Sequence, residues 1–196
     1  GGFGYAYGIS AADLDGDGDL DLVAADTDVG LYWFENDGRG GFTQHVIHRR
    51  TGEWLERHAV ADIDGDGRPE IVAVAEQGTQ LLAFEADGAF QWRSPVLAAN
   101  VGAAAPFLAD LDGDGRAEIL IGRQVLDGDG SLRWTGSGPR VGRSPVTGLH
   151  AVAADLDLDG IPEVVVGPSA YEADGTLLWN AASVGDGTVA VANLDA

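Results

Sequence analysis

The chain has 196 residues and no cysteine, and its 32 acidic and 11 basic residues give a formal net charge of −21. This length suffices for one domain with a hydrophobic core or for an array of small repeats. The missing cysteines exclude disulfides and thiolate metal sites, and the acidic balance argues against nucleic acid as a partner. No apolar run is long enough to insert into a membrane, and no signal peptide is recognisable.

Four acidic loops of nine residues recur along the chain, each with an acid at positions 1, 3, 5 and 9. They begin at Asp13, Asp62, Asp110 and Asp155, which are 49, 48 and 45 residues apart. Neighbouring carboxylates repel each other by about 1 kcal/mol per pair at 4 Å even in water, so we expect a cation in each loop. Ca²⁺ takes six to eight oxygen ligands in a flexible shell. The sequence therefore predicts about four Ca²⁺ ions, which would move the net charge from −21 to −13.

Short apolar segments flank every loop. One precedes each loop, at residues 8–12, 58–61, 106–109 and 150–154. A β-branched or aliphatic segment follows each loop, at residues 22–25, 71–74, 119–121 and 164–166. Such short runs between glycine-rich turns are typical of strands, and no stretch has the apolar spacing of a helix.

A second turn follows in each repeat, at Asp37-Gly38, Asp87-Gly88, Asp129-Gly130 and Asp174-Gly175. Asp-Gly favours a hairpin and predicts a fourth strand after the turn. Trp92, Trp134 and Trp179 each lie five residues past the turn Asp, and His45 lies near the matching place in the first repeat. Four antiparallel strands in about 45 residues are typical of a β-propeller blade. Helical arrays with repeats of similar length consist of helices and do not fit this pattern of short strands.

The sequence therefore predicts an all-β chain that forms a single repeat domain over residues 1–196. The expected blades cover residues 5–50, 56–97, 103–137 and 147–182. Residues 187–196 look like a fifth unit, with its first strand over 187–192 followed by the start of a loop. Three assemblies stay open: a segment of a longer propeller, four blades that close alone, or self-association in which this terminal strand completes a neighbouring copy.

The four nonapeptides resemble the Asp-x-Asp-x-Asp-Gly-x-x-Asp/Glu loops of FG-GAP and VCBS repeats, the units of integrin α-subunit-like propellers. The resemblance covers residues 5–195 and implies side-chain ligands at positions 1, 3, 5 and 9, with a backbone carbonyl at position 7. The metal ligands that it implies are Asp13, Asp15, Asp17, Asp19 and Asp21; Asp62, Asp64, Asp66, Arg68 and Glu70; Asp110, Asp112, Asp114, Arg116 and Glu118; Asp155, Asp157, Asp159, Ile161 and Glu163.

The acidic loops allow two other interpretations. An EF-hand requires a glutamate at position 12, where this chain has Ala24, Ala73, Ile121 and Val166. A solvated acidic turn is the other, and it fits Asp127-Gly-Asp129-Gly, which lacks acids at the matching positions 1 and 9. The four complete loops carry all four acids, which favours metal binding.

The tryptophans allow two interpretations. The shared register of Trp92, Trp134 and Trp179 favours packing between neighbouring blades over sugar stacking. Trp33 and Trp54 lie off this register and are the better candidates for a surface contact.

The resemblance implies a non-enzymatic, secreted or cell-surface module, in which Ca²⁺ stiffens the loops and which serves in adhesion or as a scaffold with a protein or glycan ligand. Millimolar extracellular calcium suits loops of this kind. Two alternatives remain: a lectin with carbohydrate between the blades, and the propeller portion of a polysaccharide lyase. Neither His58 nor His150 has another histidine spaced for a zinc site, and the sequence contains no Gly-x-Ser-x-Gly elbow and no lysine for a phosphate-binding loop. No catalytic residue is assigned.

Overall fold

A computed structural model describes residues 6–26, 30–49, 55, 57–75, 77–101, 104–138, 142–144, 148–181 and 183–192. Within these residues the chain has eighteen strands and no helix. The strands form four antiparallel sheets of four strands and one two-stranded ribbon. In each large sheet the strands lie side by side in chain order. The predicted all-β class is therefore confirmed.

The four sheets follow the repeats of the sequence. The first contains β1 (Ala6–Ala12), β2 (Asp21–Asp26), β3 (Gly30–Asn36) and β4 (Phe42–Arg49). The second contains β5 (His58–Ala61), β6 (Glu70–Ala75), β7 (Gln80–Phe84) and β8 (Phe90–Arg93). The third contains β9 (Phe107–Ala109), β10 (Glu118–Ile121), β11 (Gln124–Leu126) and β12 (Leu132–Thr135). The fourth contains β15 (Val152–Ala154), β16 (Glu163–Val166), β17 (Ser169–Tyr171) and β18 (Leu177–Asn180).

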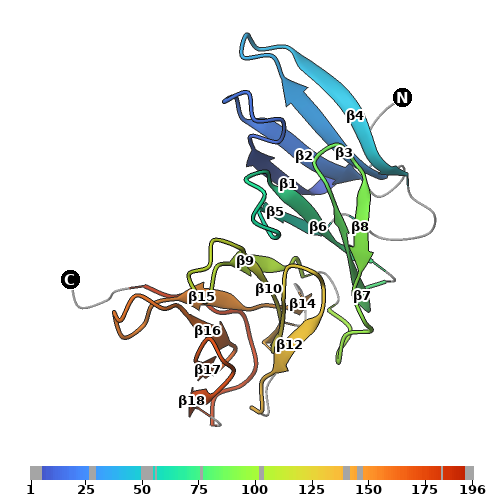
Figure 1. Cartoon of the computed structure of the whole chain (residues 1–196). Coiled ribbons are helices and arrows are strands. Elements are labelled where there is room, and N and C mark those ends of the chain that lie inside the picture. The colour runs from blue at the N-terminus through green and yellow to red at the C-terminus, as the bar shows by residue number, and fades with distance from the viewer. Residues whose placement is uncertain are drawn as a thin grey trace.

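Successive sheets are joined through their first strands. β1 contacts β5, β5 contacts β9, and β9 contacts β15, while the fourth strand lies at the opposite edge of each sheet. Figure 1 shows the sheets following one another from the N-terminal sheet at the top to the C-terminal sheet below it. The four sheets do not close into a ring.

The hydrophobic core lies between the sheets in three clusters, one for each pair of neighbours. The second strand of the second sheet shows why its residues after Glu70 are all apolar. Ile71 and Ala73 face the first sheet, whereas Val72 and Val74 face the third. Alternate residues of a strand point to opposite faces, so a strand that is covered on both sides reads as a continuous apolar run.

Tryptophans of the outer strands connect neighbouring sheets, as their shared register predicts. The indole N–H of Trp92 donates to the carbonyl oxygen of Gly128 in the third sheet's turn at 2.8 Å. Trp134 makes the corresponding bond to Ala173 of the fourth sheet at 2.9 Å. Trp179 has the same register, and its side chain is exposed. The first sheet has His45 at this place, so its contact with the second sheet lacks the indole bond.

Trp33 differs from the expectation of a surface contact. Its ring stacks on His45 at a centroid distance of 4.5 Å and packs against the core between the first two sheets. It is therefore used in packing. Trp54, the other candidate, lies outside the described residues.

Two features of the C-terminal half differ from the sequence-based expectation. Residues 187–192 form no strand, because none of the described strands pairs with this segment; residues 193–196 lie outside the described part. A short ribbon that was not predicted, β13 (Arg143–Ser144) with β14 (Gly148–Leu149), lies between the third and fourth sheets in the chain. No helix of membrane-spanning length and apolarity occurs among the described residues.

Candidate metal centres

The four acidic loops connect the first and second strands of the four sheets, and the same backbone hydrogen bonds hold each of them. The position-1 aspartate accepts the N–H of the position-6 glycine at 3.0 Å in every loop. The position-3 aspartate accepts the N–H of position 5, and the position-5 aspartate accepts the N–H of position 7. The carboxylates are thus fixed on the inner side of a tight turn by the loop's own backbone.

The acid at position 9 lies at the start of the second strand and closes the loop. It accepts the N–H of position 2 in all four copies, over distances of 3.0, 2.9, 2.8 and 2.6 Å. In the first three loops the position-2 residue, Leu14, Ile63 or Leu111, is buried in the core cluster between that sheet and the next one. The loops are therefore tied directly to the hydrophobic core.

Glycine at position 6 is required by the backbone, since its φ lies between 88° and 95° in the four loops. Position 4 also has positive φ, and it is glycine in three loops but Leu158 in the fourth, with a φ of 67°. A residue with a Cβ is strained in this region, so the fourth loop is the least relaxed of the four.

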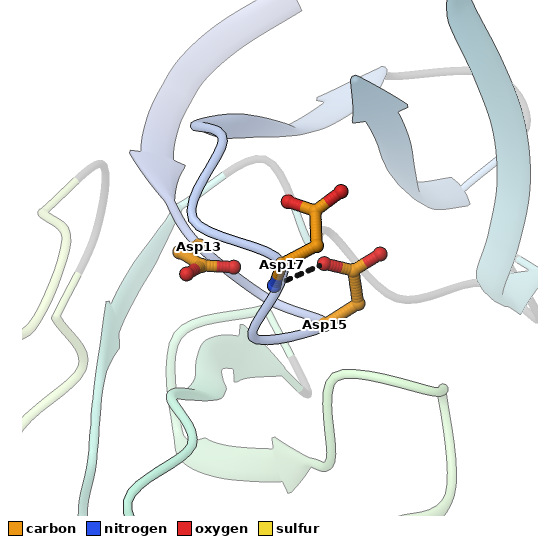
Figure 2. Close-up of side chains that lie close together, drawn as sticks. All are labelled: Asp13, Asp15 and Asp17. Carbon is orange, nitrogen blue, oxygen red and sulfur yellow. Dashed lines mark hydrogen bonds between the residues drawn. The ribbon is translucent and has the colours of Figure 1, made fainter. Parts of the chain in front are cut away.

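The structure gathers carboxylate oxygens into one cluster per loop, with ligand atoms of three acids within 4.8 Å of one another. Figure 2 shows the first cluster, in which Asp13, Asp15 and Asp17 extend from one turn. The clusters are Asp13, Asp15 and Asp17; Asp62, Asp64 and Asp66; Asp110, Asp112 and Glu118; Asp155, Asp157 and Glu163. The predicted side-chain ligands outside these groups are Asp21, Glu70, Asp114 and Asp159.

The carbonyl ligands predicted at position 7 belong to Asp19, Arg68, Arg116 and Ile161. The N–H group of each donates to the position-5 aspartate of its own loop at 2.8 or 2.9 Å. The backbone at position 7 is therefore part of the turn in every copy. Their role as metal ligands stays a prediction.

Glu70 tests whether the second loop suits a cation. Its Oε2 accepts the N–H of Ile63, while its Oε1 is buried without a hydrogen-bond partner. Burial, opposed by the Ile63 bond and reinforced by Asp64 and Glu85, raises the pKa of Glu70 from 4.5 to about 7. A buried carboxylate oxygen of this kind lacks a positive partner, and a divalent ion in the loop would supply one.

A further acid, which is not among the predicted ligands, lies beside each loop. Glu35, Glu85, Asp127 and Glu172 stand two residues before the turn Asp of the outer hairpin. Glu35 and Glu85 raise the pKa of Asp15 and Glu70, after burial as the larger cause. The regular spacing before Asp-Gly is the signal that could have found this additional carboxylate.

Asp127 and Asp129 form a turn, as predicted. The N–H of Asp127 donates to Ser131 O, and the carboxylate of Asp129 accepts the N–H of Ser131, both at 2.9 Å. Asp127 nevertheless lies near the third loop, because its Oδ1 is 2.7 Å from Nε of Arg133, which also contacts Asp112 and Glu118.

The comparison with known families agrees with this geometry. A family model described as an FG-GAP-like repeat matches residues 13–73 and 62–121, which together span more than half of the chain. The chain belongs to the FG-GAP-like repeat family. No curated protein sequence matches it significantly.

Several solved structures resemble this FG-GAP-like chain. The biofilm matrix protein Bap1 of V. cholerae is 25% identical with a TM-score of 0.61, and the match covers 92% of this chain and 29% of Bap1. The exotype rhamnogalacturonan lyase YesX is 20% identical with a TM-score of 0.55, covering 88% of this chain and 37% of the lyase. BBS1N in complex with ARL6DN is 14% identical with a TM-score of 0.55, covering 90% of this chain and 55% of that one. The chain thus spans about a third of the first two proteins.

FG-GAP-like repeats and the likeness to a matrix protein point to a non-enzymatic module. The likeness to the lyase and to BBS1N, at lower identity, is a likeness of fold. An extracellular location is compatible with the family and with the matrix protein.

Proposed function

We propose that this chain is a calcium-binding β-propeller module of an extracellular protein, in which Ca²⁺ stiffens the loop between the first two strands of each blade. The observation that carries the proposal is the fourfold repetition of one carboxylate cluster on one hydrogen-bonded frame. The orphaned oxygen of Glu70 supports it. The dense carboxylate set favours a hard cation with many oxygen ligands, which is the preference of Ca²⁺.

The sheets support the blade arrangement in the same way. Each is a four-stranded antiparallel meander, and their first strands contact one another in succession. This is the order of strands from the inner to the outer edge of a propeller blade. Further blades from the same or another chain would continue the series.

The proposed task of the module is adhesive or structural. Calcium bound at each loop would hold the turn in place, in the first three loops above the core residue at position 2, and so stiffen the end of the sheet where a partner could bind. The proposed partner is a protein or a glycan, and self-association of copies is a further proposal. Light scattering tests self-association, and glycan-array binding with and without calcium tests the glycan.

Calorimetric titration tests calcium binding directly, with about four ions expected per chain. Extracellular modules bind with Kd of roughly 10⁻⁴–10⁻³ M, and ligand at ten times Kd adds about 1.4 kcal/mol per site. Four sites would add about 6 kcal/mol, which corresponds to roughly 10–20 °C in Tm for a chain of this size. An equal Tm in calcium and in EGTA would contradict the proposal.

A matched pair of variants separates the metal loop from an ordinary acidic turn. Asp66 and Asp87 lie in two loops of the same sheet, and both are exposed. Each accepts the backbone N–H of the residue two positions later in the chain at 2.8 Å. Only Asp66 belongs to a cluster. Asp66→Asn should remove one bound ion in the titration, whereas Asp87→Asn should leave the number of bound ions unchanged.

A further inference from the structure

One basic side chain from an outer hairpin lies against the third acidic loop. Nη2 of Arg133 donates to Oδ2 of Asp112 at 2.6 Å, and its Nη1 is 3.4 Å from Oε1 of Glu118. Asp112 and Glu118 are two of the three residues in the third cluster. A guanidinium therefore binds the carboxylates of two residues that the proposed ion would need.

Arg133 reaches the loop because of an irregularity in its sheet. The register between the third and fourth strands shifts in the last three sheets, so that one residue of the fourth strand has no partner across the ladder. This bulge residue is Gln91 in β8, Arg133 in β12 and Leu178 in β18. A bulge turns the extra side chain away from the regular alternation.

The three bulge residues form a natural series beside otherwise similar loops. Gln91 donates to Glu85 Oε1 at 2.7 Å and lies 3.4 Å from Oδ2 of Asp64, the position-3 acid of its own loop. Arg133 holds the matching acids, Asp127 and Asp112. Leu178 has no group that could bind a carboxylate. The bulge residue beside the position-3 acid is thus neutral in the second sheet, positive in the third and neutral in the fourth, while each loop keeps its four acids.

We propose that Arg133 is an affinity-determining residue that weakens calcium binding at the third loop, so that the fourth loop fills before the third. The inference rests on the proposed function, in which the loops bind calcium. Coulomb repulsion between a single positive charge and a divalent ion about 5 Å away in water lowers the affinity by roughly tenfold. Competition for the oxygens of Asp112 and Glu118 acts in the same direction.

Space for the displaced side chain is present next to the loop. A cleft of about 480 Å³ between the second and third sheets is lined by Arg133, Asp127, Asp129 and Trp92. The guanidinium can leave Asp112 and turn into this cleft while it keeps the ion pair with Asp127. In the third loop, calcium would then replace the Arg133 guanidinium as the positive partner of the carboxylates. The carboxylates would have a positive partner both with and without bound calcium.

Each loop can be followed separately in an NMR calcium titration of the full chain. The amide of the position-6 glycine is bonded to the position-1 aspartate in every loop, so each reports on its own site. Gly115 reports on the third loop and Gly160 on the fourth. In the wild-type chain the midpoint for Gly115 should lie at a calcium concentration roughly tenfold above the midpoint for Gly160.

Reciprocal variants test the role of the bulge residue. Arg133→Leu should lower the Gly115 midpoint by about tenfold, and Leu178→Arg should raise the Gly160 midpoint by a similar factor. Arg133→Gln, which introduces the bulge residue of the second sheet, should also lower the Gly115 midpoint, with little change in packing. Arg93→Leu, on the exposed surface of β8, should move neither midpoint.

The outcomes separate this inference from the proposed function. If no glycine amide responds to calcium in the wild-type chain, the proposed function itself fails. If the amides respond but both Arg133 variants leave the Gly115 midpoint unchanged, Arg133 has no influence on affinity and the inference is overturned. A higher Gly115 midpoint in these variants would also overturn it, since Arg133 would then support the site.

Discussion

Leu158 offers a test of the loop geometry that needs no ligand. Its φ of 67° lies in the left-handed region, where the other three loops have glycine, and its side chain is 87% exposed. A left-handed conformation costs a residue with a Cβ about 1–2 kcal/mol. Glycine would remove this strain but would lose about 0.5–1 kcal/mol through the greater freedom of the unfolded chain. Leu158→Gly should therefore stabilise the protein by about 0.5–1 kcal/mol, or roughly 1–4 °C in Tm.

Gly113→Leu is the reciprocal change in the third loop. A Cβ at Gly113, with a φ of 76°, would have no heavy atom within 4 Å, so its effect comes from the backbone alone. This variant should lower Tm by about the amount that Leu158→Gly raises it. Both are measured by thermal unfolding in EGTA and again in calcium. A lower Tm for Leu158→Gly in EGTA would refute the reasoning, because it would mean that the leucine makes a stabilising contact.

Three further predictions concern the sheets. A Cβ added at Gly128 would collide with the carbonyl oxygen of Ile63, so Gly128→Ala should lower the unfolding free energy in urea by about 1–3 kcal/mol; no change would show that the sheets can separate freely. Trp134→Phe keeps a six-membered aromatic ring but removes the indole N–H and its bond to Ala173, and should cost about 1 kcal/mol in the same assay; a neutral result would show that this bond adds nothing. Burial lowers the pKa of His58 from 6.5 to about 4, so as the pH falls through this window the unfolded chain takes up a proton that the folded chain does not bind. The unfolding free energy should fall by about 3 kcal/mol between pH 6.5 and 4, and His58→Phe should lack this part of the decrease; identical pH profiles would contradict it.

The strands could be read from the sequence because local patterns determine them. β5 begins and ends at the predicted residues, His58 and Ala61, and the strands on both sides of every loop agree to within two residues. Alternation, glycine turns and Asp-Gly hairpins all act over a few neighbouring residues. The tryptophan register also indicated packing between sheets. A residue that recurs at the same place in each repeat contacts the same part of the next repeat.

Features that depend on distant partners were not predictable in this way. Arg133 lies 21 residues from Asp112 in the chain, and only the bulge in β12 brings the two together. The unpaired oxygen of Glu70 depends on what surrounds it in three dimensions. The segment 187–192 shows the opposite failure, because its alternating sequence favours a strand, whereas none of the described strands pairs with it.

The unequal seams between the sheets have a mechanical consequence. Indole bonds fasten the second sheet to the third and the third to the fourth, whereas the outer strand of the first sheet has His45 in place of the tryptophan and so lacks this bond. Among the described residues the sheets contact one another in chain order through their first strands, so a pulling force is carried from seam to seam along the series. A pulling force applied at the N-terminal end would therefore detach the first sheet at a lower force than the other three, which would stay folded together.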